Sequence, residues 1–342
     1  MKKHTDGLRN FLNQKGLVKT KMKVLITGGA GFIGSYLCEE LLKKGEEVFV
    51  LDDLSTGSLK NVKNFLKNKN FHLYIDTVLN ISITEELVKK SDFVFHLASV
   101  VGVKRVMENP IDSLLINILG THNVLKSCVT HKKRVLITST SEIYGKNKNV
   151  PFNEDADIVI GSTKKKRWSY ACSKAIDEFL SFAYKEEKNL PVIIVRLFNT
   201  VGPRQTGRYG MVIPKFVKQA LNNEPITVFG TGNQTRCFIH VKDVVETLLK
   251  LIEEENAYGN VYNIGSTEEI KIRDLALKIK NITGSNSEIK FINPETVYSS
   301  GFEDMERRIP DVSKIKNIIN FELKYSLNDI IEDVVNYYKN EQ

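Results

Sequence analysis

Short apolar segments alternate with segments of helical periodicity between residues 23 and 199, and this alternation limits the folds open to the chain. The segments with the length and composition of strands are KVLITG (23–28), EVFVLDDL (47–54), FHLYID (71–76), FVFHLAS (93–99), RVLITST (134–140) and PVIIVRLFN (191–199). The intervening segments with apolar residues at helical spacing are 32–45, 83–90, 113–131 and 169–187. Strands that alternate with helices form a parallel sheet covered on both faces, so we predict an α/β fold.

The sequence TGGAGFIG (27–34) lies between the first predicted strand and the first predicted helix. Gly28, Gly31 and Gly34 have the spacing of a dinucleotide-binding turn, in which the chain turns tightly, the backbone approaches a pyrophosphate and the helix packs close to its strand. Asp52 follows the second strand, where a carboxylate can accept hydrogen bonds from ribose hydroxyls and would repel a 2′-phosphate. We therefore predict a Rossmann-type doubly wound sheet that binds NAD rather than NADP.

The regular alternation ends near residue 200, where turn sequences, short strands and a predicted helix at 326–340 follow. This part is too interleaved with the first to fold alone, so we predict a smaller, interleaved C-terminal substrate domain. The predicted boundaries are 22–199 for the NAD-binding Rossmann domain, with a return segment near 236–265, and 200–342 for most of the substrate domain. Residues 1–21 precede the first strand and are predicted to form a flexible or loosely docked N-terminal extension.

The composition allows a large core, since 42% of the 342 residues are hydrophobic, but no apolar run reaches the roughly 18–20 residues that span a bilayer. The N-terminus carries basic residues without the apolar segment of a secretory signal, so we expect a cytoplasmic protein without membrane contact. The cysteines are far apart and lack paired metal spacing, which predicts reduced thiols and no metal site: Cys38, Cys128, Cys172 and Cys237.

The net charge of +8 and the pI near 9.0 raise the question of nucleic-acid binding. The lysines are scattered along the chain and often alternate with asparagine, as on a solvated surface, and no nucleic-acid-binding motif is present. We therefore expect no nucleic-acid partner. The positive charge is instead suited to attracting an anionic metabolite.

Tyr170 and Lys174 lie four residues apart in the predicted helix 169–187, so they share one face and the ammonium can lie near the phenol. That arrangement is expected to lower the phenol pKa from about 10 toward working pH and makes Tyr170 a candidate general base. A Tyr-x-x-x-Lys pair is common by itself. This one gains weight because it follows a dinucleotide turn and a Thr/Ser-rich strand end at 138–141.

Together these motifs resemble the extended short-chain dehydrogenase/reductase family, whose nucleotide-sugar branch includes epimerases, dehydratases and decarboxylases. The resemblance extends from residue 22 to the C-terminus. It implies that Thr140, Tyr170 and Lys174 are the catalytic threonine, tyrosine and lysine. It also implies NAD contacts from Gly28, Gly31, Phe32, Ile33, Gly34, Asp52, Asp76, Thr77, Leu97, Ala98, Asn117, Tyr170 and Lys174.

The same resemblance implies a set of substrate contacts. RLFNTVGPR puts Asn199 at the family's substrate-diphosphate contact, QTRCFIHVKD puts Arg236 at its phosphate-binding arginine, and ERRIPDVSK places Arg308 beside the diphosphate or sugar. Ser141 and Arg208 complete the predicted substrate set. Arginine favours phosphate through its bidentate fork but is also common on surfaces, so surface charge is the alternative for Arg236 and Arg308.

Glu142 follows a strand that leaves the core, where an unpaired carboxylate is costly. The sequence Thr-Ser-Glu at 140–142 resembles the UDP-glucuronate decarboxylases, as does KKKRWSYACSK (164–174), whereas 4,6-dehydratases carry Asp-Glu after the threonine. The resemblance implies a catalytic Glu142 near the C5 position of the sugar. The alternative is a structural glutamate paired with a lysine of the adjacent loop.

The resemblance therefore implies an NAD-dependent enzyme that acts on a nucleotide sugar through a 4-keto intermediate, and a UDP-glucuronate decarboxylase-like activity is favoured. A UDP-sugar 4-epimerase and then a 4,6-dehydratase are the alternatives, and a non-catalytic NAD-sensing protein is disfavoured because Tyr170 and Lys174 are both kept. The resemblance also implies a homodimer that pairs two long helices per subunit, the candidates being 113–129 and 171–185.

Overall fold

A computed structural model describes residues 21–102, 106, 108–207, 211–293 and 305–340. Nearly the whole predicted N-terminal extension (1–20) and Arg208 lie outside the described residues. No helix within the described ranges is both long enough and apolar enough to cross a membrane.

A seven-stranded sheet forms the centre of the molecule, in the order β11-β6-β5-β4-β1-β2-β3. Its strands are β1 (Lys23–Thr27), β2 (Glu47–Leu51), β3 (Phe71–Tyr74), β4 (Phe93–His96), β5 (Arg134–Thr140), β6 (Val192–Leu197) and β11 (Asn260–Ile264). All neighbouring strands are parallel. The chain runs outward from β1 to β3 and then crosses to β4 on the other side of β1, which makes the carboxyl ends of β1 and β4 a topological switch point.

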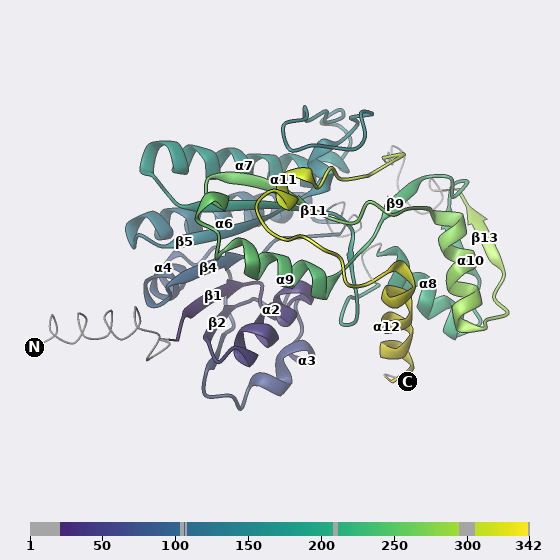
Figure 1. The fold of residues 1–342 in the computed structure, drawn as a ribbon, viewed down its shortest axis with the longest axis horizontal. Coiled ribbons are helices and arrows are strands. Elements are labelled where there is room, and N and C mark those ends of the chain that lie inside the picture. The colour runs from purple at the N-terminus through teal and green to yellow at the C-terminus, as the bar shows by residue number, and fades with distance from the viewer. Residues whose placement is uncertain (1–20, 103–105, 107, 208–210, 294–304, 341–342) are drawn as a thin grey trace, which may run out of the picture.

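Helices cover both faces of the sheet (Figure 1). One face carries α2 (Phe32–Lys43), α3 (Leu59–Val62), α9 (Val241–Leu251) and α11 (Ser313–Lys316), and the other carries α4 (Ile81–Lys90), α6 (Pro110–Thr130) and α7 (Trp168–Lys188). Successive residues of a strand point to opposite faces, so Val24 and Ile26 enter the first core and Leu25 enters the second. This architecture confirms the predicted α/β doubly wound fold.

A smaller part of the molecule has its own apolar core and lies beside the carboxyl ends of the sheet strands (Figure 1). It contains α8 (Val212–Leu221), β8 (Ile226–Phe229), α10 (Ile272–Thr283), β13 (Ile289–Ile292) and α12 (Leu327–Lys339). Short pairs join it to the sheet region: β7 (Thr200–Val201) with β10 (Ile239–His240), and β9 (Thr235–Cys237) with β12 (Glu269–Lys271). Between these elements the chain returns to the sheet as β11, so the two parts are interleaved, as expected.

Candidate active site

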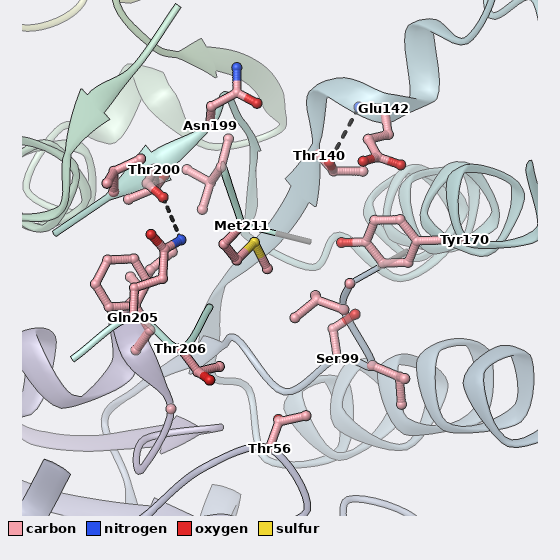
Figure 2. Close-up of a pocket in the computed structure, with 18 of the residues that line it drawn as sticks. Thr56, Ser99, Thr140, Glu142, Tyr170, Asn199, Thr200, Gln205, Thr206 and Met211 are labelled. Carbon is pink, nitrogen blue, oxygen red and sulfur yellow. Dashed lines mark hydrogen bonds between the residues drawn. The ribbon is translucent and has the colours of Figure 1, made fainter. Parts of the chain in front are cut away.

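A cavity of about 860 Å³ lies at the carboxyl ends of β1, β4, β5 and β6. Its wall begins at the glycine turn, passes the end of β5 and the start of α7, and continues to α8 and β8 of the smaller part. Figure 2 shows Tyr170 and Thr140 on one side of this space and Thr200, Gln205 and Met211 on the other. Open parallel sheets bind ligands at this edge, so the fold places the cavity where a cofactor and a substrate can meet.

The glycine turn leaves no room for side chains at two positions. Gly28 has φ +74°, and a Cβ there would lie 2.8 Å from the backbone nitrogen of Ala98. A Cβ on Gly34 would lie 2.3 Å from the carbonyl oxygen of Gly28. The turn is therefore closed tightly against the start of α2, and the first residues of α2 line the cavity. This cradle fits a dinucleotide, because the N–H groups at the start of a helix bind a pyrophosphate.

Two acidic side chains follow the next two strands and line the same end of the cavity. Asp52 is buried and accepts hydrogen bonds from the backbone N–H groups of Ala30 and Leu54, each at 2.9 Å. Burial raises the pKa of the Asp52 carboxyl, and these two donors oppose that effect. Asp76 accepts a hydrogen bond of 2.7 Å from the N–H of Thr77. Both carboxylates, which were predicted to contact NAD, are thus held in place by backbone N–H groups.

The loop after β4 forms the floor of the cavity. Leu97 and Ala98 are held by hydrogen bonds from their N–H groups to Thr27, at 3.1 and 3.2 Å. Asn117 is buried behind this loop, where its Oδ1 accepts from Ser99 Oγ at 3.0 Å and from the N–H of Val100 at 2.8 Å. Asn117 does not itself line the cavity, and its side chain holds the loop that does.

Tyr170 projects from the first turn of α7 into the cavity, between Thr140 above and Ser99 below in Figure 2. Burial raises the pKa of its phenol, and the negative charges of Glu142 and Asp177 raise it further. Hydrogen bonds with Thr140 and Ser99 act in the opposite direction. The sequence spacing predicts a lowered phenol pKa, whereas the surroundings of Tyr170 raise it.

Burial is the largest cause of this raised pKa, and the charge of Lys174, which could oppose it, is paired with a carboxylate. The Lys174 ammonium donates a hydrogen bond of 2.7 Å to the carboxylate of Asp177, one turn further along α7. Lys174 shares a helix face with Tyr170 as predicted, but it is buried behind the cavity wall and its charge is balanced by a carboxylate. The Tyr-x-x-x-Lys spacing predicts the position of the lysine but says nothing of Asp177.

Glu142 lies in a one-turn 3₁₀ helix, η2 (Ser141–Tyr144), which Thr140 caps by accepting a hydrogen bond of 3.2 Å from the N–H of Glu142. The Glu142 carboxylate forms a short ion pair with Arg167 and lies 3.8 Å from Arg308. Burial alone would raise the pKa of Glu142, but the charges of Arg167 and Arg308 outweigh it and hold the pKa below its usual value. The expected alternative of a lysine partner is wrong, because both partners are arginines.

The other predicted substrate residues gather around this pair. Arg236 and Arg308 are each only 7% exposed, which excludes surface charge as an explanation for them. Arg236 donates to the carbonyl oxygens of Thr235 and Met305, at 2.7 and 2.9 Å. Asn199 accepts a hydrogen bond of 3.5 Å from Arg308. All three line the cavity, as do Arg167 and Glu142, and the charges of the three arginines all act on the Glu142 carboxylate.

Ser141, a member of the predicted substrate set, has a hydroxyl without a hydrogen-bond partner among the described residues. The residue is 1% exposed, and its Oγ makes no hydrogen bond there. A buried hydroxyl without a partner is costly, and this one belongs to a residue on the cavity wall. The geometry suits a hydroxyl that binds a ligand atom.

Sequence reasoning missed Arg167. The basic run KKKR (164–167) suggested a solvated surface, yet Arg167 is 4% exposed and lies on the cavity wall. Its position three residues before Tyr170 places it on the same helix face, one turn earlier. That spacing was the signal that could have identified it.

The parallel sheet, the glycine turn and the Tyr-x-x-x-Lys helix beside a threonine define an extended short-chain dehydrogenase/reductase of the nucleotide-sugar type. Within that class, the chain belongs to the family described as GDP-mannose 4,6 dehydratase, whose sequence model matches residues 25–334.

Similar proteins include UDP-N-acetyl-alpha-D-glucosaminuronate decarboxylase of Bacillus cytotoxicus, 41% identical over 320 residues that cover 93% of this chain and 98% of that one. UDP-glucuronic acid decarboxylase 1 of Xenopus tropicalis is 34% identical over an alignment that covers 94% of this chain and 73% of that protein. The solved structure of UDP-glucuronic acid 4-epimerase from Bacillus cereus, in complex with UDP-glucuronic acid and NAD, superimposes with a TM-score of 0.85 at 29% identity. That match covers 94% of this chain and 100% of the epimerase.

Proposed function

We propose that this protein is an NAD-dependent decarboxylase of UDP-linked uronic acids, with UDP-glucuronate and its 2-acetamido counterpart as the candidate substrates. One observation carries the proposal: the carboxylate of Glu142 is flanked by Arg167 and Arg308 beside Tyr170 and Thr140. The relatives that are named decarboxylases support it.

When bound, NAD would supply the hydride acceptor for carbon 4 of the sugar and, in its oxidised form, a positive charge that would favour the phenolate. The residues proposed to hold it are those of the glycine turn together with Asp52, Asp76, Thr77, Leu97 and Ala98, supported by Asn117 and Lys174 from behind. We retain 22–199 as the proposed NAD-binding domain and 200–342 as most of the substrate domain.

In the proposed chemistry the phenolic oxygen of Tyr170 accepts the proton of the 4-hydroxyl. Thr140 meanwhile hydrogen-bonds the 4-oxygen. A 4-keto sugar with a carboxylate on C5 is a β-keto acid. The bond between C5 and the carboxyl carbon breaks, its electrons form an enolate on the 4-oxygen, and CO₂ leaves. Thr140 and Tyr170 are then placed to stabilise that oxygen, and a proton returns to C5.

The charges beside Glu142 are suited to a substrate that carries a carboxylate. Arg167, Arg308 and Arg236 all act on the one carboxylate of Glu142, which does not offset the positive charge of all three. Guanidinium groups bind carboxylates through two parallel hydrogen bonds. Glu142 lies next to the same arginines and can disfavour the bound carboxylate relative to neutral CO₂ through like-charge repulsion.

Arg167→Met should raise KM for a UDP-uronic acid by tenfold to a hundredfold, since a buried hydrogen bond to a charged group is worth about 1.5–3 kcal/mol. Binding of a UDP-hexose, whose sugar carries no charge, should change little. Arg134→Met is the matched control, because Arg134 pairs with Glu255 on the surface. Equal losses for the charged and neutral sugars would show that Arg167 does not recognise the carboxylate.

The likeness to a UDP-glucuronic acid 4-epimerase supports a second candidate, 4-epimerisation through the same 4-keto sugar. Incubation with a panel of UDP-, GDP- and dTDP-linked sugars and uronic acids, read by mass spectrometry, separates the reactions. Decarboxylation lowers the substrate mass by CO₂, dehydration lowers it by water, and epimerisation leaves it unchanged. We expect the CO₂ loss, and only with a uronic acid.

We also propose a homodimer formed through α6 and α7, which pack side by side on the sheet. Apolar side chains that the monomer leaves exposed lie on these helices, among them Ile111, Leu115, Leu119 and Phe179, the last 69% exposed. Four cysteines without disulfides suit the reducing cytoplasm, which we propose as its location.

Phe179→Asp should convert the dimer to a monomer, because it places a charge in the proposed apolar interface. Leu277→Asp on α10 is the matched control, since Leu277 is also exposed but lies outside α6 and α7. Light scattering at micromolar concentration reports the mass. A monomeric unaltered protein would contradict the proposed interface.

A further inference from the structure

Asp177 is a buried carboxylate on α7 that none of the motifs predicted. It lies seven residues after Tyr170 and three after Lys174, so the three side chains occupy one face of the helix. The Lys174 ammonium and the Asp177 carboxylate are 2.7 Å apart, and their side chains are 2% and 0% exposed. A buried ion pair contributes little stability compared with apolar residues of similar size. Its position beside Tyr170 points to an electrostatic role.

The Lys174–Asp177 ion pair changes the electrostatic field at the phenol of Tyr170. A lone ammonium on this face would favour the phenolate, but the paired carboxylate cancels much of its field. Other charged groups face the same region: Glu142, which is paired with Arg167, and Glu178, which is paired with Arg196. The neutral groups that face it are Thr121 of α6 and His96 of β4 beside the pair, and Thr140 and Ser99 beside the phenol. Asp177 is the carboxylate that directly contacts Lys174.

We propose that Asp177 is a positioning residue. Its carboxylate holds the Lys174 ammonium on the face of α7 that Tyr170 shares, and it offsets part of the positive charge near the Tyr170 phenol. It acts through Lys174, because neither side chain lines the cavity. The inference rests on the proposed roles of Tyr170 and Lys174, but not on the identity of the sugar. Without Asp177 the charge of Lys174 would favour the phenolate of Tyr170, and with Asp177 much of that charge is offset.

The test is a phenolate titration of the NAD-saturated protein without substrate. The chain has 12 tyrosines, so the signal of Tyr170 is obtained by subtracting the absorbance of the same protein carrying Tyr170→Phe. Removal of a nearby negative charge favours the phenolate, so Asp177→Asn should lower the pKa of Tyr170 by about one unit or more. The matched control is Glu186→Gln, which removes an exposed carboxylate from the same helix and should leave the titration unchanged.

A double-mutant cycle keeps the test decisive if Asp177→Asn fails to fold. Lys174→Gln should raise the pKa of Tyr170, and Lys174→Gln combined with Asp177→Asn should return it close to that of the unaltered protein, because the pair is then removed as a unit. The inference is overturned if Asp177→Asn leaves the pKa of Tyr170 unchanged, or if Tyr170 has the same pKa in Lys174→Gln and in the double variant. Because no sugar is present, a protein that fails to decarboxylate any uronic acid would contradict the proposed function and leave this result intact.

Discussion

Tyr170→Phe should abolish turnover of the nucleotide sugar while NAD remains bound. The phenolic oxygen is the group that faces the cavity between Thr140 and Ser99, so its removal deletes the proposed proton acceptor and leaves the glycine turn and Asp52 intact. A positioned acid or base contributes about 10²- to 10⁴-fold, so kcat should fall by roughly 10³-fold or more. Single-turnover absorbance measures whether any NADH forms, and calorimetry measures NAD binding.

Tyr184→Phe is the matched control for this experiment. Tyr184 lies on the same helix and its hydroxyl contacts His122 at 3.2 Å, away from the cavity wall. The control should retain normal turnover. If Tyr170→Phe keeps turnover within about tenfold of the unaltered protein, the role assigned to Tyr170 is wrong.

Glu142→Gln should slow the steps that follow oxidation and leave the first hydride transfer nearly intact. NADH should therefore accumulate on the enzyme when a UDP-uronic acid is added. Glutamine keeps an oxygen that can accept from Arg167, so the fold of η2 is preserved while the negative charge is lost. The expected loss in overall rate is on the order of 10²-fold, or about 2.7 kcal/mol.

Glu255→Gln is the matched control, because it makes the same substitution in a glutamate–arginine pair at the surface. Exposed ion pairs are worth roughly 0–1 kcal/mol, so the control should leave turnover and the amount of bound NADH unchanged. Progress curves for Glu142→Gln that match those of the unaltered protein, on substrate that the latter decarboxylates, would assign Glu142 a purely structural role. Slow turnover without NADH accumulation would place its contribution before oxidation.

The sheet and the cofactor end of the cavity were predictable because their signals are local. The glycine spacing, the strand before it and Asp52 after the next strand all lie within one βαβ unit, where the parallel sheet fixes their relative positions. The carboxyl ends of adjacent strands meet at one edge, so Thr140 and Asn199 could also be expected at the same cavity.

The charge arrangement was not predictable in the same way. Glu142, Arg167 and Arg308 come from η2, the start of α7 and the segment that precedes α11, and only the folded chain shows that they meet. A lowered pKa was expected for Tyr170 because the Tyr-x-x-x-Lys motif shows neither the burial of the phenol, which is the largest cause of its raised pKa, nor the Asp177 carboxylate one turn beyond Lys174. The side chain contacts, rather than the sequence spacing, decide which charges reach a reacting group.

The most direct measurement of the central claim is the release of labelled CO₂ from UDP-glucuronate, and from its 2-acetamido counterpart, labelled at the carboxyl carbon. The account predicts label in the gas phase in proportion to the loss of substrate, with the unaltered protein and NAD, and none with Tyr170→Phe. Conversion of the substrate with all of the label retained in the nucleotide sugar would contradict the account and identify the protein as an epimerase.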